Sequence, residues 1–175
     1  MKYFKKLAAA ILSLIALSSC DIYYFLDIEN KFSEGVYYWT DFYVFEYEAN
    51  GGYRTYGYDI PKSIDEIDRL DELGYIEPSQ TGYYTSVEYG RFVSDKRAVS
   101  DMFSHTDVIT VVIFDAKTAE ENLKNGKLPD SVIQKYWIKK DDVLEKDGKT
   151  YKDITFPPNE GMKDVEMEPA YGTYN

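Results

Sequence analysis

The chain has 175 residues, of which 31 are acidic and 20 are basic, and its formal net charge is -11. A negative charge of this size argues against nucleic acid as a partner, because the phosphate backbone would repel the chain. Cys20 is the only cysteine, so an internal disulfide is excluded and stability has to come from packing, to which the 18 tyrosines and 9 phenylalanines contribute.

Residues 1–19 have the three parts of a signal peptide. Early lysines form a basic start, an apolar run extends from Leu7 to Leu17, and small residues precede Cys20. The apolar run is too short for a membrane-spanning helix, which needs about 20 apolar residues. We therefore expect this segment to be removed after export.

Leu17-Ser18-Ser19-Cys20 resembles the lipobox of bacterial lipoproteins. The resemblance implies that the Cys20 thiol receives diacylglycerol, that cleavage occurs just before it, and that the membrane is a partner through acyl chains on Cys20. Two or more acyl chains make a stable anchor, which a single chain does not. The alternative is an ordinary secretory signal in which the cysteine stands by chance. Ile22–Leu26 follows Cys20 almost at once, so we expect the domain to sit close to the membrane.

Tyr37–Glu48 is rich in aromatic and branched residues and predicts a strand. Asn50-Gly51-Gly52 marks a turn, after which Tyr53–Tyr58 is the expected hairpin partner. An alternation of period two would place one set of side chains on a single face: Tyr37, Trp39, Asp41, Tyr43, Phe45 and Tyr47. These rings either fill the core, which we prefer, or form an exposed platform for a ligand. A buried Asp41 would need a polar partner.

The segment from Ser63 to Leu73 predicts a helix. Ser63 and Glu66 have the spacing of a capping box, and Gly74 is the expected stop. Apolar residues recur every three positions, at Ile64, Ile67, Leu70 and Leu73. We expect this stripe to pack on a sheet rather than to bind a partner helix.

The second half alternates strands with short helices. Val108–Phe114 is a continuous apolar run and predicts a strand buried on both faces. The remaining expectations, in chain order, are a strand at Thr85–Val93, an irregular or helical stretch at Lys96–His105, helices at Thr118–Asn125 and Asp130–Gln134, an extended segment at Tyr136–Lys139, a turn at Asp147-Gly148 and a strand at Ile154–Phe156. Thr118 is the expected cap of its helix and Gly126 its end.

We predict one domain over residues 20–158, followed by an acidic, flexible tail at 159–175. Its expected fold is mainly β, an antiparallel sandwich-like arrangement with short helices. An α+β two-layer arrangement is the alternative.

The stretch from Asp107 to Pro158 resembles a family of small lipoproteins common in Bacteroidota. The matching residues are Val108–Asp115, then Tyr136, Ile138, Asp142 and Leu144, and finally Ile154, Thr155, Phe156 and Pro157. This chain differs by an insertion at Asp147-Gly148-Lys149 and by its acidic C-terminal segment. The resemblance implies lipidation, an envelope location and a mostly β architecture, and it supplies no catalytic or ligand-binding residues.

The sequence offers little for catalysis. His105 is the only histidine, and Cys20 is used by the anchor, so a nucleophile and base of the usual kinds are not available together. One histidine does not make a zinc site, and Asp141–Asp153 lacks the order of a calcium-binding EF-hand loop. We therefore expect no metal and no other cofactor. Carboxylate pairs could support glycoside hydrolysis, but composition alone nominates none.

These observations predict a non-catalytic interaction or structural module of the cell envelope. The first alternative is a glycan-binding lipoprotein that uses Tyr37, Trp39 and Tyr43, and an envelope protein is the other possible partner. A carboxylate-dependent hydrolase is the remaining alternative. The expected location is the periplasmic face of the outer membrane, although Asp21 after the cysteine resembles an inner-membrane retention signal and the cell surface stays open.

Overall fold

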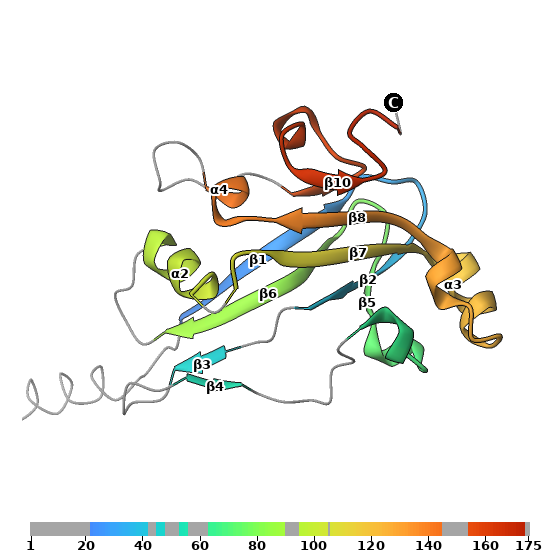
Figure 1. Cartoon of the computed structure of the whole chain (residues 1–175), viewed down its shortest axis with the longest axis horizontal. Coiled ribbons are helices and arrows are strands. Elements are labelled where there is room, and N and C mark those ends of the chain that lie inside the picture. Colours follow the sequence, from blue (N-terminus) through green and yellow to red (C-terminus); the bar gives the residue numbers. More distant parts are fainter. Residues whose placement is uncertain are drawn as a thin grey trace, which may run out of the picture.

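A computed structural model of the chain describes residues 22–41, 45–47, 53–55, 63–89, 95–104, 106–144 and 154–173. In these residues ten strands form two five-stranded sheets that pack against each other, with short helices at the periphery (Figure 1). The predicted mainly β, sandwich-like fold is confirmed, and the two-layer α+β alternative is wrong.

The first sheet is built around its long central pair of strands. Its order is β4 (Tyr53–Thr55), β3 (Phe45–Tyr47), β6 (Thr81–Tyr89), β1 (Ile22–Asn30) and β9 (Thr155–Phe156). β1 and β6 are antiparallel, whereas β9 runs parallel to β1 and β3 runs parallel to β6. The predicted pairing of residues 53–58 with the aromatic strand is confirmed for β3 and β4, while the turn at residues 50–52 lies outside the described residues.

The second sheet is antiparallel throughout. Its order is β10 (Glu166–Glu168), β8 (Val132–Ile138), β7 (Ile109–Asp115), β2 (Val36–Thr40) and β5 (Gly74–Ile76). β7 is the central strand, and its side chains are buried from Val111 to Phe114. The predicted core strand buried on both faces is therefore confirmed.

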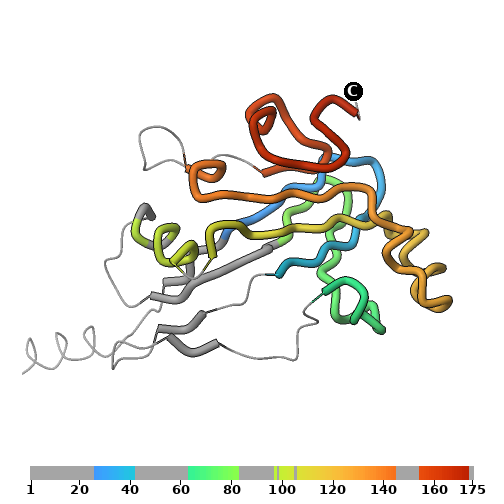
Figure 2. The backbone as a smooth tube through the Cα atoms, viewed as in Figure 1, coloured from blue at the N-terminus to red at the C-terminus, as the bar shows by residue number. Residues whose placement is uncertain are grey.

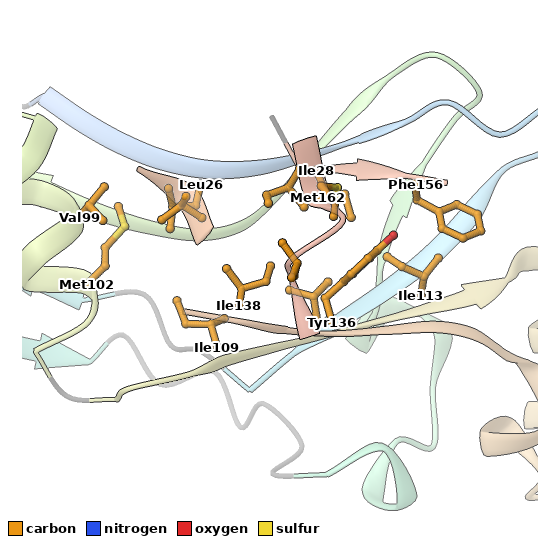
Figure 3. Close-up of a cluster of buried hydrophobic side chains, with 14 of the residues drawn as sticks. Leu26, Ile28, Val99, Met102, Ile109, Ile113, Tyr136, Ile138, Phe156 and Met162 are labelled. Carbon is orange, nitrogen blue, oxygen red and sulfur yellow. The ribbon is translucent and has the colours of Figure 1, made fainter. Parts of the chain in front are cut away.

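The main core lies between the two sheets. Leu26 and Ile28 of β1 face Ile109 and Ile113 of β7, together with Tyr136 of β8 (Figure 3). The helix α2 (Asp95–Met102) closes one end of this core through Val99 and Met102. The helical alternative predicted for residues 96–105 is thus confirmed.

Helices cover the opposite, outer face of the second sheet. A second apolar cluster there joins Trp39, Val112 and Phe114 of the sheet to Ile67 and Leu73. The covering elements are the 3-10 helices η1 (Ile64–Glu66), η2 (Leu70–Glu72) and η3 (Leu128–Ser131) and the helix α3 (Ala116–Leu123). The prediction that the stripe from Ile64 to Leu73 packs on a sheet is confirmed.

The predicted helix at residues 63–73 is wrong. The chain forms two separate 3-10 turns, with Ile67 extended between them and no side-chain cap from Ser63. An apolar spacing of strictly three residues fits the 3.0 residues per turn of a 3-10 helix better than the 3.6 of an α-helix. Gly74 belongs to β5, where a Cβ atom would overlap the ring of Tyr38.

The single aromatic strand predicted at Tyr37–Glu48 is also wrong. Its two ends belong to different sheets, as β2 and β3. Just after β2, the Asp41 carboxylate accepts a hydrogen bond from the Thr110 backbone N–H, at 2.7 Å. Asp41 is exposed, and its backbone N–H donates in turn to the Thr110 carbonyl at 3.3 Å.

Other boundaries shift by a few residues. β6 begins at Thr81 and β8 at Val132, earlier than predicted, so the helical turn expected at Asp130–Gln134 is instead η3 followed by strand. The N-cap of α3 is Asp115 rather than Thr118, and its carboxylate accepts a hydrogen bond from the Thr118 N–H at 2.8 Å. The predicted last strand is confirmed as β9, and the turn at residues 147–148 lies outside the described residues.

The acidic segment after Pro158 is part of the domain and not a flexible tail. Met162, in the 3-10 helix η4 (Glu160–Met162), is 1% exposed, and Val165 is also buried. The C-terminal segment runs beside the rest of the second sheet, where β10 pairs with β8 (Figure 2). Lys139 also forms an ion pair with Glu166 at 3.0 Å. The acidic side chains line the outside while the apolar ones between them enter the core.

Candidate functional site

The predicted aromatic platform begins at β2, whose side chains alternate between the two faces of the second sheet. Val36 enters the main core, whereas Tyr37 and Trp39 lie on the outer face. Trp39 is only 7% exposed because it is covered by the cluster that contains Ile67 and Leu73. Its ring cannot serve as an open stacking surface, so the predicted role of Trp39 in ligand binding is wrong. Tyr43 lies outside the described residues.

Tyr37 is half-buried and pairs with a tyrosine that the sequence analysis did not select. Tyr75 stands opposite Tyr37 across the antiparallel pair β2–β5, and the two ring centroids are 5.0 Å apart with an interplanar angle of 52°. β5 is an edge strand, and the Tyr75 side chain is 49% exposed. The two rings therefore form an aromatic pair that is open to solvent on one side.

The absence of a side chain at Gly35 leaves room for the Tyr75 ring. A Cβ atom on Gly35 would overlap the Tyr75 hydroxyl and approach the end of its ring, so a side chain at this position would displace the phenol. The loop that carries Gly35 is held by Asn30, whose Nδ2 donates to the carbonyl of Glu34 at 2.9 Å and to that of Ile76 at 3.1 Å. One buried amide thus fixes both the loop and the edge strand that positions Tyr75.

A carboxylate from α3 completes the site. The Tyr37 hydroxyl donates to Oε1 of Glu120 at 3.3 Å, and Glu120 is exposed. Partial burial, the negative charge of Glu120 and this hydrogen bond raise the pKa of Tyr37 above its ordinary value, with a smaller contribution from Tyr75. The phenol therefore stays protonated at neutral pH and keeps donating to Glu120. We call Tyr37, Tyr75 and Glu120 the tyrosine–glutamate site.

Sequence patterns gave little sign of Tyr75 and Glu120. Tyr75 follows Gly74, which was the predicted end of a helix, and Glu120 was expected only as a residue of the helix predicted at Thr118–Asn125. The two residues meet Tyr37 only because β5 and α3 both dock against the end of β2. The alternation in residues 37–41 was the one usable signal, since it placed Tyr37 and Trp39 on the same face of a strand.

A second concave feature lies near the other edge of the same sheet. It is an open depression of about 360 Å³ lined by Val132, Ile133, Lys135, Glu168 and Pro169. The neighbouring Gln134 is fully buried, and its Nε2 donates to the Pro169 carbonyl at 3.0 Å, while its Oε1 has no hydrogen-bond partner in the described part of the chain. The lining combines one cation, one carboxylate and aliphatic side chains, which does not define a ligand class.

The other predicted site residues are not brought into these features. Cys20 and His105 lie outside the described residues. Among the residues that are described, no three histidine, cysteine or carboxylate side chains gather in a way that could hold a metal ion. No helix within the same ranges combines the length and the apolar character needed to cross a bilayer.

No protein-family model, curated protein or solved structure matches this chain. Its function is therefore inferred from its own residues.

Proposed function

We propose that this chain is a lipid-anchored protein of the bacterial cell envelope and that its folded domain is a non-catalytic interaction module. The observation that carries the proposal is the position of β1, which begins at Ile22, two residues after the lipobox cysteine. A signal peptide, a lipobox and the first strand of the fold follow one another with almost no spacer. Cys20 is the proposed lipidation site.

The short connection places the domain close to the membrane. Two residues of extended chain span at most about 7 Å, so acyl chains on Cys20 would hold the start of β1 near the lipid headgroups. β1 lies inside the first sheet, between β6 and β9, and is fixed by pairing along its length. Anchoring at this point would therefore restrict the orientation of the whole sandwich.

The proposed role as an interaction module is supported by the tyrosine–glutamate site. Its two aromatic rings belong to the second sheet and its carboxylate belongs to α3, and both elements are held by buried contacts. The Tyr75 side chain is exposed to solvent. Exposed tyrosines on a rigid scaffold are favourable contact residues, because they provide a large area and lose little side-chain entropy on binding. The periplasmic face of the outer membrane is the proposed location.

Intact-mass analysis of the membrane fraction tests the anchor. The wild-type chain is expected to begin at Cys20 and to carry the added mass of its acyl groups, such as palmitate. Cys20→Ser should abolish lipid incorporation and leave the precursor uncut by the lipoprotein signal peptidase. Ser18→Ala and Ser19→Ala are suitable controls, since small residues are retained before the cysteine. A Cys20→Ser chain that still carries lipid would contradict the proposal.

Crosslinking in living cells tests the interaction role. A photo-crosslinking amino acid at position 75 is expected to capture an envelope protein, whereas the same group at exposed Lys124 is the control for random collisions. Identical capture at both positions would contradict a specific contact at the tyrosine–glutamate site.

A further inference from the structure

We propose that the tyrosine–glutamate site binds a lysine or arginine side chain of a protein partner. This inference deepens the proposed function and rests on it for the nature of the partner. It is argued from the ring geometry, from the Glu120 carboxylate and from the position of the site in the fold.

The three side chains have the chemistry of a cation-binding site. A cation over the face of a tyrosine is attracted by the electrons of the ring, and a nearby carboxylate adds direct charge attraction. The Tyr37 hydroxyl donates a hydrogen bond to Glu120, so the ring and the carboxylate lie next to each other and can contact the same cation. In the described part of the chain, neither Lys117 of α3 nor Lys124 just after it forms an ion pair with Glu120, which leaves the Glu120 charge available to an external cation.

Charge complementarity favours a cation over a neutral sugar. The chain carries a net charge of -11, and the exposed residues Glu34 and Glu77 flank the site along the sequence. The two rings are tilted by 52°, so they do not form the single flat platform on which a sugar ring would stack. The carboxylate and the tilted rings instead border a small acidic and aromatic surface that suits one positively charged group.

The position of the site fits a partner away from the lipid. β1 starts at the end of the sandwich near α2, and the site lies toward the other end, where α3 follows β7 (Figure 1). The nine-residue β1 spans roughly 26 Å at about 3.3 Å per residue, and the loop after it leads directly to β2. An anchor at Cys20 would therefore leave Tyr37 and Tyr75 well clear of the headgroups.

Calorimetric titration of the full chain, extracted from membranes in detergent, with a hexalysine peptide tests the proposal. Tyr75→Ala and Glu120→Gln are each expected to weaken binding roughly threefold to tenfold, the loss typical of one exposed cation–aromatic or charge contact. Tyr75→Phe should retain binding within about twofold, because the ring face is preserved. Glu121→Gln is the matched control, since it removes the same charge from the next residue of α3.

The outcomes separate the two proposals. Equal losses for Glu120→Gln and Glu121→Gln would overturn the site, because they would show attraction to the overall negative charge alone. Binding of an N-acetylglucosamine oligomer at Tyr75 without binding of hexalysine would overturn the cationic ligand in favour of a glycan. The intact mass of the same preparation measures lipidation separately. An acylated chain that does not bind hexalysine would refute only the cation site. An unacylated chain that binds hexalysine would refute only the anchor.

Discussion

The Tyr136 hydroxyl donates a buried hydrogen bond to the carbonyl oxygen of Thr155, at 3.0 Å, and so joins the two sheets through the core. Tyr136 belongs to β8 of the second sheet, and Thr155 belongs to β9 of the first. Tyr136 is fully buried among apolar side chains (Figure 3). A polar contact inside an apolar core specifies how the sheets align, because misalignment would leave both groups without a partner.

Tyr136→Phe is expected to lower the free energy of unfolding by about 1–2 kcal/mol, because it leaves the buried Thr155 carbonyl without this donor. Urea unfolding followed by circular dichroism measures the change. Tyr75→Phe, which removes a hydroxyl from an exposed ring, serves as the control and should change stability little. If Tyr136→Phe lowers the free energy of unfolding no more than Tyr75→Phe does, the inter-sheet hydrogen bond does not stabilise the fold.

Asn30→Ala is expected to cost about 2–4 kcal/mol of stability, since Asn30 is fully buried and its side chain serves three backbone groups. Besides its two donated bonds, Oδ1 accepts from the Phe32 N–H at 2.9 Å. Asn30→Asp keeps the acceptor but cannot donate when ionised, so it should be nearly as damaging. Asn125→Ala, which loses one exposed contact to the Glu121 carbonyl, is the control, and a similar loss there would contradict this account.

Met162→Ala is expected to destabilise the protein by about 2–4 kcal/mol, as is usual when a buried methionine is truncated. Met162 packs in the main core, and its sulfur lies 3.2 Å from the backbone nitrogen of Thr155. Lys163→Ala, at the adjacent exposed position, should stay within about 0.5 kcal/mol of wild type. Thermal unfolding midpoints of the two variants measure these effects. If neither substitution lowers the midpoint, the segment after Pro158 does not contribute to the core.

Tyr37 is expected to titrate above the ordinary range of tyrosine. Burial, Glu120 and Tyr75 raise its pKa, so ionisation is less favourable in the folded chain than in the unfolded chain. The resulting stabilisation is fully present below the unfolded pKa and is lost as the pH rises through the folded pKa. Glu120→Gln should move the Tyr37 pKa back toward normal.

Carbon-13 NMR of ring-labelled tyrosines measures this titration, with Tyr37→Phe to assign the signal. Glu121→Gln is again the matched control, and an equal movement of the Tyr37 pKa in both variants would show that Glu120 has no special contact.

Much of the architecture follows from local sequence. The run at residues 108–114 is almost wholly apolar and short for a helix, so it predicted a strand buried on both sides, as β7 is. The turn predicted at Asn50-Gly51-Gly52 likewise indicated that the segments before and after it pair, as β3 and β4 do. The anchor at Cys20 and the envelope location stay predictions, because the described residues begin at Ile22.

By itself, then, the sequence determined the strand-rich class, the core strand β7 and the apolar stripe from Ile64 to Leu73, because hydrophobic spacing is a property of neighbouring residues. Only the tertiary structure decided that Trp39 is covered, that the segment after Pro158 is packed, and that Tyr75 and Glu120 meet Tyr37. Burial and contact depend on which distant segment docks on a given face, and alternation along one strand carries no information about that partner.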